Sequence, residues 1–458
     1  MTQAAGSQQQ GGAIGAMARW IAGLEENAIP AAVRGVALNC LVDTIGVIAA
    51  GSATPVAAHA RALAAISAAE GACAIIGGDR RCDLRQAAFA NGVAAHALDF
   101  DDNCYAGFVH GSAVIAPAAL AAAQHADAGG AQLITAFVVG AECEYALGLA
   151  TANVLYDQGW WTTGVLGPVG ACAAAARLLR LDARQTAAAL GLAVAGAAGI
   201  KACFGSDAKA FLAGRAAEAG VTAALMAQAG ASGPVDAFEH RNGFIKLFNG
   251  GRFDAGVFEK LGQRWTLLDP GVDVKRIPVC LSSHAAVDVA LDLAQEHGID
   301  PGEIEAIACN VPPIVIANLV HDDPATPQQA QFSMPFAIAA ALLHGAPGLA
   351  QLSPQALADA DLRALMARVS MFSGAVWEDA AYRAAAPEGA ELSIALRDGR
   401  VLQGFRDFAR GAARYPLTVE EIGAKFEGCL RYAGLRMPAL LPSLRALETR
   451  GSVRDLFA

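Results

Sequence analysis

The chain has 458 residues, of which 55% are hydrophobic, and a formal net charge of −10. A chain of this length can bury a large core and is expected to hold two domains. The negative charge argues against nucleic acid as a partner, because nucleic-acid binding uses clustered Lys and Arg side chains, but it leaves room for a small anionic substrate held by a few buried cations.

The first residues and the apolar stretches give no sign of a targeting or membrane segment. Residues 1–12 are rich in Gln, Gly and Ser and are predicted to be a disordered tail. The most apolar stretches, such as 162–176 and 186–200, are shorter than the roughly 18 residues that a spanning helix needs. Ten cysteines without a CxxC pair are expected to be reduced core residues. We therefore predict a cytoplasmic protein with no membrane partner.

The chain from about residue 13 to 264 has a helical pattern, because Ala, Leu and Val recur at spacings of three and four. One helix is expected to begin after Ile29-Pro30 and to run through Val47. Another is expected over 208–229, capped by Ser206-Asp207.

The composition changes near residues 265–270, and the run 274–279 is rich in β-branched residues. The pattern then predicts a strand over 304–316 and a hairpin over 391–405, because Asp398-Gly399 tolerates the positive φ of a tight turn. The helices that the same pattern predicts are 283–297, 332–344, 354–367, 418–432 and 441–450.

These elements predict a mainly α fold with two domains. A large helical domain is expected to combine residues 13–267 with residues 405–458. A smaller α/β domain, residues 268–404, is expected to be inserted into it as a lid, with helices packed on an antiparallel sheet. A cleft between two domains is the natural place for a ligand.

The segment 96–102, HALDFDD, followed by His110-Gly111-Ser112, carries three carboxylates and two imidazoles within 15 residues. Such groups are costly to bury unless they are paired or used. We therefore predict a cleft that handles protons and anions. The alternative is a turn between two helices, with Asp residues capping the second helix.

Other well-known site motifs are missing from the sequence. No GxGxxG follows a strand, and neither GxxxxGK[ST] nor HExxH nor GxSxG occurs. The run Gly77–Arg81 reads as a polar turn. We therefore predict neither a nucleotide cofactor nor a metal.

Five segments in order resemble motifs of one family. They are 29–52 (with LVDTIGVIAAGS), 90–117 (with ANG, HALDFDD and HGS), 205–217 (GSDAKAFLAGRAA), 275–278 (KRIP) and 330–336 (AQFSMPF). In these segments the chain resembles the MmgE/PrpD family, which includes 2-methylcitrate dehydratase, cis-aconitate decarboxylase and iminodisuccinate epimerase. The resemblance implies a helical domain with a smaller α/β lid, a homodimer, and a small di- or tricarboxylate as substrate.

The resemblance also implies a set of site residues. Asp99, His110, Lys209 and Lys275 match positions that line the family's site. We predict Lys209 and His110 as acid/base groups, Tyr145 as an alternative partner base and Asp99 as an orienting residue. The residues predicted to bind the substrate are Lys275, Arg276, Asn103, Ser112, Ser206, Trp161 and Phe336.

The chain departs from the family pattern at several of these positions. Trp161 and Leu212 stand where many relatives have His, Phe336 stands where they have Tyr, and Gly111 replaces a Pro. A dehydratase needs an acid for the leaving hydroxyl, whereas an epimerase has no leaving group. The loss of donors therefore favours an epimerase of the iminodisuccinate epimerase kind. A hydro-lyase, a decarboxylase and a non-catalytic metabolite-binding protein are the alternatives.

Overall fold

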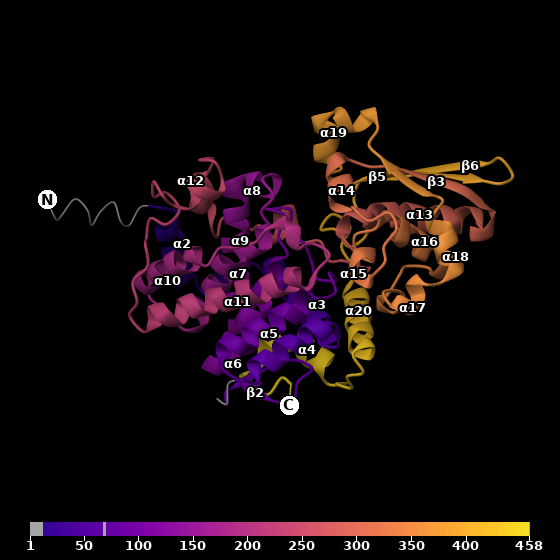
Figure 1. The fold of residues 1–458 in the computed structure, drawn as a ribbon. Helices are drawn as coiled ribbons and strands as arrows, with labels where there is room; N and C mark the ends of the chain where they lie inside the picture. Colours follow the sequence, from indigo (N-terminus) through magenta and orange to yellow (C-terminus); the bar gives the residue numbers. More distant parts are fainter. Residues whose placement is uncertain (1–11, 67–69, 458) are drawn as a thin grey trace. The chain divides into compact units, whose positions relative to one another are not determined.

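The computed structural model describes residues 12–66 and 70–457, which form two compact units (Figure 1). The first unit comprises Met1–Ala97, Asp101–Val272 and Thr418–Ala458, and the second comprises Leu98–Phe100 and Asp273–Leu417. Boundaries were predicted at 267/268 and 404/405. Apart from Gly12, the predicted disordered tail 1–12 lies outside the described residues.

The first unit is helical, which confirms the mainly α fold. A two-stranded pairing of β1 (Cys73–Ala74) with β2 (Arg81–Cys82) is its small β element. Its helices are α2 (Ala13–Gly23), α3 (Ala31–Gly51), α4 (Pro55–Ala64), α5 (Leu84–His96), α6 (Gly111–Ala126), α7 (Gly130–Thr151), α8 (Val154–Asp157), α9 (Thr162–Leu178), α10 (Ala183–Ala195), α11 (Asp207–Gln228), α12 (Phe244–Phe248), α20 (Val419–Tyr432) and α21 (Leu440–Arg445).

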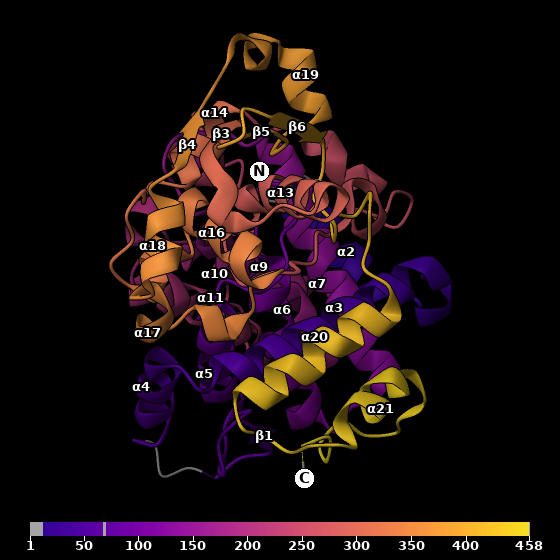
Figure 2. The ribbon, with the colours of Figure 1, turned by 90° about the vertical axis from the view of Figure 1, so that its right-hand side faces the viewer.

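The C-terminal helices complete this unit, as predicted. Helix α20 begins with a capping box between Thr418 and Glu421 and runs alongside α3 (Figure 2). Within the pair, Lys425 of α20 forms a buried ion pair with Asp43 of α3, with 2.8 Å between Nζ and Oδ1. This contact fastens two segments that are far apart in the sequence.

Helix α11 packs against α5, α9 and α10. The crossing with α5 is close because both helices present glycine there: a Cβ added at Gly92 would lie 2.9 Å from the Cα of Gly214. The helix begins one residue before the predicted start. The predicted cap is wrong in detail, since the Ser206 hydroxyl donates to the carbonyl of Cys203 instead of capping α11.

Two helices of the described chain, α3 and α7, are long and apolar enough to cross a membrane by length and composition. This corrects the expectation that every apolar stretch is too short, because Asp43, Glu142 and Glu144 interrupt the apolar runs without ending the helices. In α7, 94% of the most apolar window is buried inside the unit, as in a core helix.

The second unit packs helices on one four-stranded sheet. Figure 1 shows α13 and α16 covering one face of this sheet. The elements are α13 (His284–His297), β3 (Ile304–Asn310), α14 (Pro313–Asn318), α15 (Pro327–Ala330), α16 (Met334–His344), α17 (Pro354–Leu357), α18 (Ala360–Met366), β4 (Val369–Phe372), α19 (Ala380–Ala385), β5 (Ala390–Leu396) and β6 (Val401–Arg406).

The strand order is β4-β3-β5-β6. Strands β3, β5 and β6 pair antiparallel, and the predicted hairpin turns at Gly399, whose φ is 89°. Strand β4 was not predicted and pairs parallel to β3, so the sheet is mixed. The β-branched run 274–279 is irregular and forms no strand, and Pro278 within it has no backbone N–H to donate to a strand partner.

A buried histidine at the start of α13 makes the stability of this unit depend on pH. Burial and the nearby Lys275 and Arg276 lower the pKa of His284 to about 3. Since the unfolded pKa is about 6.5, only the unfolded chain binds this proton between the two values, and stability falls as the pH falls from about 6.5. The expected loss by pH 4.5 is roughly 2–3 kcal/mol.

The substitution His284→Gln is therefore expected to flatten the acid side of the stability curve relative to the unmodified chain. Urea titrations between pH 4.5 and pH 7.5 measure the effect. The control is His297→Gln at the exposed end of the same helix. Equal slopes for His284→Gln and the unmodified chain would contradict the prediction.

Candidate active site

The polar segment singled out in the sequence connects α5 to α6, two helices of the first unit, and its residues Leu98–Phe100 belong to the second unit. His96 is the last residue of α5 and His110 is the N-cap of α6. The start of α9 holds the segment in place: Thr162 donates to the Phe108 carbonyl at 2.6 Å, and Thr163 accepts from the His110 backbone N–H at 2.9 Å. Two histidines at adjoining helix ends are thus brought together.

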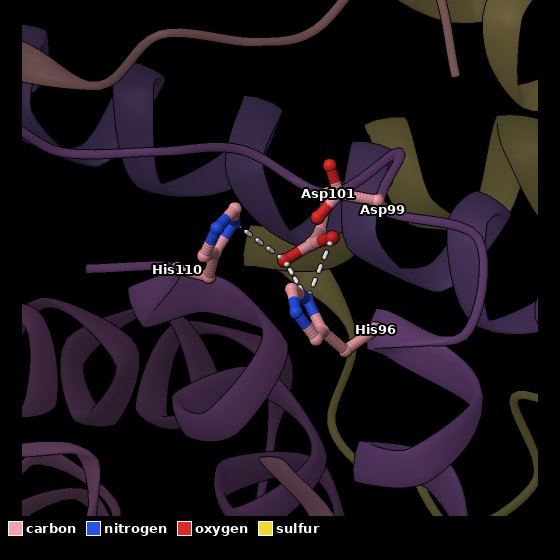
Figure 3. A group of neighbouring side chains, drawn as sticks. All are labelled: His96, Asp99, Asp101 and His110. Carbon is pink, nitrogen blue, oxygen red and sulfur yellow. Dashed lines mark hydrogen bonds and ion pairs between the residues drawn. The ribbon is translucent and has the colours of Figure 1, made fainter. Parts of the chain in front are cut away.

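Both imidazoles turn toward the carboxylate of Asp101 (Figure 3). Nδ1 of His96 lies 2.8 Å from Oδ2 of Asp101, and Nδ1 of His110 lies 3.1 Å from the same oxygen. The two rings are edge to face, with centroids 4.6 Å apart. Asp101 is completely buried, whereas the His110 side chain keeps 14% of its surface exposed. We call these three residues the His–Asp–His group.

The surroundings fix the tautomer of His110. Its Nδ1 faces two acceptors, the Asp101 carboxylate and the backbone carbonyl of Asp102 at 3.0 Å. An imidazole nitrogen between two acceptors carries a proton. In neutral His110 the basic nitrogen is therefore Nε2, the atom suited to proton transfer with a substrate.

Asp101 is the ionised member of the group. Burial alone would raise the pKa of its carboxyl, but attraction and hydrogen bonds from His96 and His110 outweigh burial and hold that pKa well below its usual range. Because this attraction is mutual, the carboxylate also stabilises an imidazolium. The group can therefore hold and deliver a proton.

Two imidazoles with carboxylates are also a donor set that suits transition metals, and the candidate ligand atoms of His96, Asp99, Asp101 and His110 lie within 4.8 Å of one another. However, the nitrogens that face the carboxylate are the ones that donate protons, and Nδ1 of His110 also faces a carbonyl. A nitrogen that carries a proton cannot bind a metal. Hydrogen bonds from the imidazoles to the carboxylate therefore account for the arrangement of the three side chains.

Three further buried side chains near the group are ionisable: Asp102, Glu144 and Tyr145. Burial raises the pKa of Asp102 to about 7, although a hydrogen bond from Ser112 opposes the shift, and burial with the nearby Asp102 raises the pKa of Glu144 to about 8. The Tyr145 phenol reaches the start of α6, where a Cβ added at Gly111 would lie 2.6 Å from its oxygen. Glycine in place of the family's proline thus accommodates Tyr145.

The remaining predicted residues of this unit take different positions. Trp161 is the N-cap of α9 and is 1% exposed, and its ring lies 5.2 Å from that of His96, so it forms a wall of the group. Asn103 is also buried and directly follows Asp102. Lys209 is buried in the first turn of α11, with Nζ 4.9 Å from the centre of the Phe204 ring. A cation over the face of an aromatic ring is stabilised by that ring.

Among the predicted residues of the second unit, Lys275 and Asp99 form an ion pair. Nζ of Lys275 lies 2.9 Å from Oδ2 of Asp99, and both side chains are almost fully buried. The predicted clamp residue Arg276 forms an ion pair with Asp288, which occupies part of its guanidinium. Phe336 is fully buried in the apolar core, a place that explains an aromatic side chain without any ligand.

His96, Asp101, Asp102 and Glu144 were not predicted as site residues. The first three belong to the polar segment that the sequence singled out, so the local density of ionisable groups was the available signal. Glu144 had the weaker signal of a second carboxylate in an apolar helix.

Comparison with known proteins decides the family. The MmgE/PrpD N-terminal domain matches residues 15–255, and the MmgE/PrpD C-terminal domain matches residues 277–436. The chain belongs to the MmgE/PrpD family. The resemblance seen in the five sequence segments is thereby confirmed.

Three similar proteins of this family carry related names. The cis-aconitate decarboxylase-like protein oryM of Aspergillus oryzae is 26% identical over 481 residues, which cover 99% of this chain and 98% of that protein. The human cis-aconitate decarboxylase is 27% identical over 368 residues, covering 76% and 73%. A cis-aconitate decarboxylase of Aspergillus terreus is 27% identical over 257 residues, covering 54% and 52%. These relatives point to the lyase-type chemistry of the family.

Proposed function

We propose that this MmgE/PrpD chain is a lyase that acts on a small di- or tricarboxylate, with decarboxylation of a cis-aconitate-like substrate as the leading reaction. The observation that carries the proposal is the His–Asp–His group, in which two imidazoles contact one buried carboxylate. The names of the similar proteins support the same reaction class.

The chemistry of the group fits this reaction. When a carboxylate leaves as CO₂, the electron pair of the broken carbon–carbon bond stays on the substrate, and a proton must be delivered to carbon. An imidazolium stabilised by Asp101 supplies that proton, and Asp101 keeps the ring oriented while the charge changes. In this scheme His110 is the proton donor, because its side chain is the more exposed of the two imidazoles.

An epimerase, favoured by the sequence alone, is the second candidate. The buried Trp161 and Phe336 replace proton donors of relatives, and inversion needs no acid for a leaving group. Inversion does need bases on opposite faces of one carbon. The rings of His96 and His110 lie 4.6 Å apart on the same carboxylate, so both would approach a substrate carbon from one face. Lys209 would then have to act as the base on the opposite face.

The test is incubation in D₂O with cis-aconitate, 2-methylcitrate and iminodisuccinate, followed by proton nuclear magnetic resonance. A new vinylic product with release of CO₂ from cis-aconitate is the expected result. Deuterium entering an α-position with inversion would select the epimerase, and water loss from 2-methylcitrate would select the hydro-lyase. No turnover of any substrate would favour the metabolite-binding alternative.

A homodimer in the cytoplasm, without nucleic acid, membrane or cofactor, stays part of the proposal. Sedimentation of the purified chain measures its oligomeric state directly, and a monomer at micromolar concentration would contradict the homodimer.

A further inference from the structure

The two neighbouring aspartates of the site, Asp101 and Asp102, are both completely buried but have different surroundings. Asp101 contacts two imidazoles. Asp102 contacts no cation that the described chain places within ion-pair distance, and its Oδ2 accepts a hydrogen bond from Ser112. Adjacent residues with equal burial thus offer a direct comparison of a paired and an unpaired carboxyl.

From these contacts we propose that Asp102 is a positioning residue that works as a neutral carboxylic acid and holds His110 in its reactive tautomer. The backbone carbonyl of Asp102 accepts from Nδ1 of His110, and the Asp102 side chain accepts from the hydroxyl of Ser112, which is two residues after His110. Asp102 therefore fastens the connecting segment to the first turn of α6 at two points, on either side of Gly111.

The surroundings favour the neutral form of this carboxyl. Within the described residues, Oδ1 of Asp102 has no hydrogen-bond partner. A buried carboxylate held only by the Ser112 hydroxyl and the Cys40 thiol would be far more costly than a buried acid. Ionisable groups of three helices and the preceding Asp101 surround the Asp102 carboxyl. Helix α3 contributes Cys40 and Asp43, and Asp43 is paired with Lys425 of α20. Helix α7 contributes Glu144 and Tyr145.

Glu144 strengthens this argument. Both of its oxygens are buried and lack hydrogen-bond partners among the described residues, so its carboxyl also favours the neutral form. It lies beneath α9, where a Cβ added at Gly170 would be 2.6 Å from its Oε2. With a second negative charge disfavoured so close by, Asp101 remains the charged carboxyl that acts on the imidazoles.

The first experiment compares substitutions at the two aspartates. Asp102→Ala removes the bond to Ser112 and is expected to lower kcat roughly tenfold to hundredfold with little change in KM. Asp102→Asn mimics the neutral acid and is expected to restore kcat and leave the pH profile unmoved. Asp101→Asn is expected to move the limb of the pH profile that reports His110 downward, because it removes the negative charge beside the imidazole.

The kinetic comparison rests on the proposed function, so a second readout is independent of activity. Nitrogen resonances of ¹⁵N-histidine report the tautomer of His110 directly. The expected result is one Nδ1–H tautomer in the unmodified chain and in Asp102→Asn, and a mixture in Asp102→Ala. If no substrate in the panel turns over, this measurement alone decides the inference.

Two results would overturn the inference. A downward shift of the pH profile in Asp102→Asn equal to that in Asp101→Asn would mean that Asp102 is ionised. An unchanged His110 tautomer in a folded Asp102→Ala would mean that Asp102 does not position the ring. Glu142→Gln is the matched control, because Glu142 is a buried carboxyl of α7 bound to the backbone N–H groups of Thr266 and Leu267; activity and tautomer should stay unchanged.

Discussion

Replacing His110 with alanine is expected to lower kcat by about 10²- to 10⁴-fold on whichever substrate of the panel is turned over. The substitution removes the imidazole whose Nε2 carries the basic lone pair, and it leaves Asp101 with His96 alone. The loss should appear in kcat rather than KM, since proton transfer is a transition-state contribution. Steady-state kinetics at several pH values measure the effect.

The matched control is His125→Ala, at the exposed other end of the same helix α6. It should retain full activity. Circular dichroism must show that both variants keep their helices. An active His110→Ala enzyme would remove His110 from the mechanism and leave Lys209 as the acid/base group to examine.

The helical part of the fold could be predicted from the sequence because apolar residues recur at helical spacing over long stretches. The start of α3 after Pro30 and the end of α20 at Tyr432 follow from such local signals. The sheet was harder to predict from the sequence than the helices. Strand β4 has four residues that alternate half-buried and exposed, and it gains its place by pairing with the distant β3. Short strands whose partners are remote leave little trace in the local sequence.

The site residues, too, could be predicted from the sequence only in part. The density of ionisable groups in 96–110 identified the right segment, and the resemblance selected His110 from it. The choice between Asp99 and Asp101 depended on the direction in which the segment turns. Asp99 has a φ of 49° and its side chain pairs with Lys275, whereas Asp101 points to the imidazoles. No local pattern distinguishes two aspartates that are two residues apart.

The pair of Lys275 and Asp99 leads to the largest expected change in stability. Lys275→Met would leave the Asp99 carboxylate, 4% exposed, without its cation, and removal of one partner of a buried pair typically costs about 3–5 kcal/mol. Nζ of Lys275 also donates to the Asp99 backbone carbonyl at 2.7 Å, so a second bond is lost. Urea unfolding, together with hydrogen exchange of peptides covering residues 273–290, measures the global and the local effect.

The double substitution Lys275→Met with Asp99→Asn separates two explanations of this pair. If the cost comes from an unpaired buried charge, the double variant should be more stable than Lys275→Met alone, because both charges are gone. Lys260→Met, at an exposed lysine, controls for the loss of a surface charge. A Lys275→Met chain as stable as the unmodified one would contradict the prediction. If that chain also lost activity, Lys275 would be a substrate cation, as the family resemblance implies, rather than a structural one.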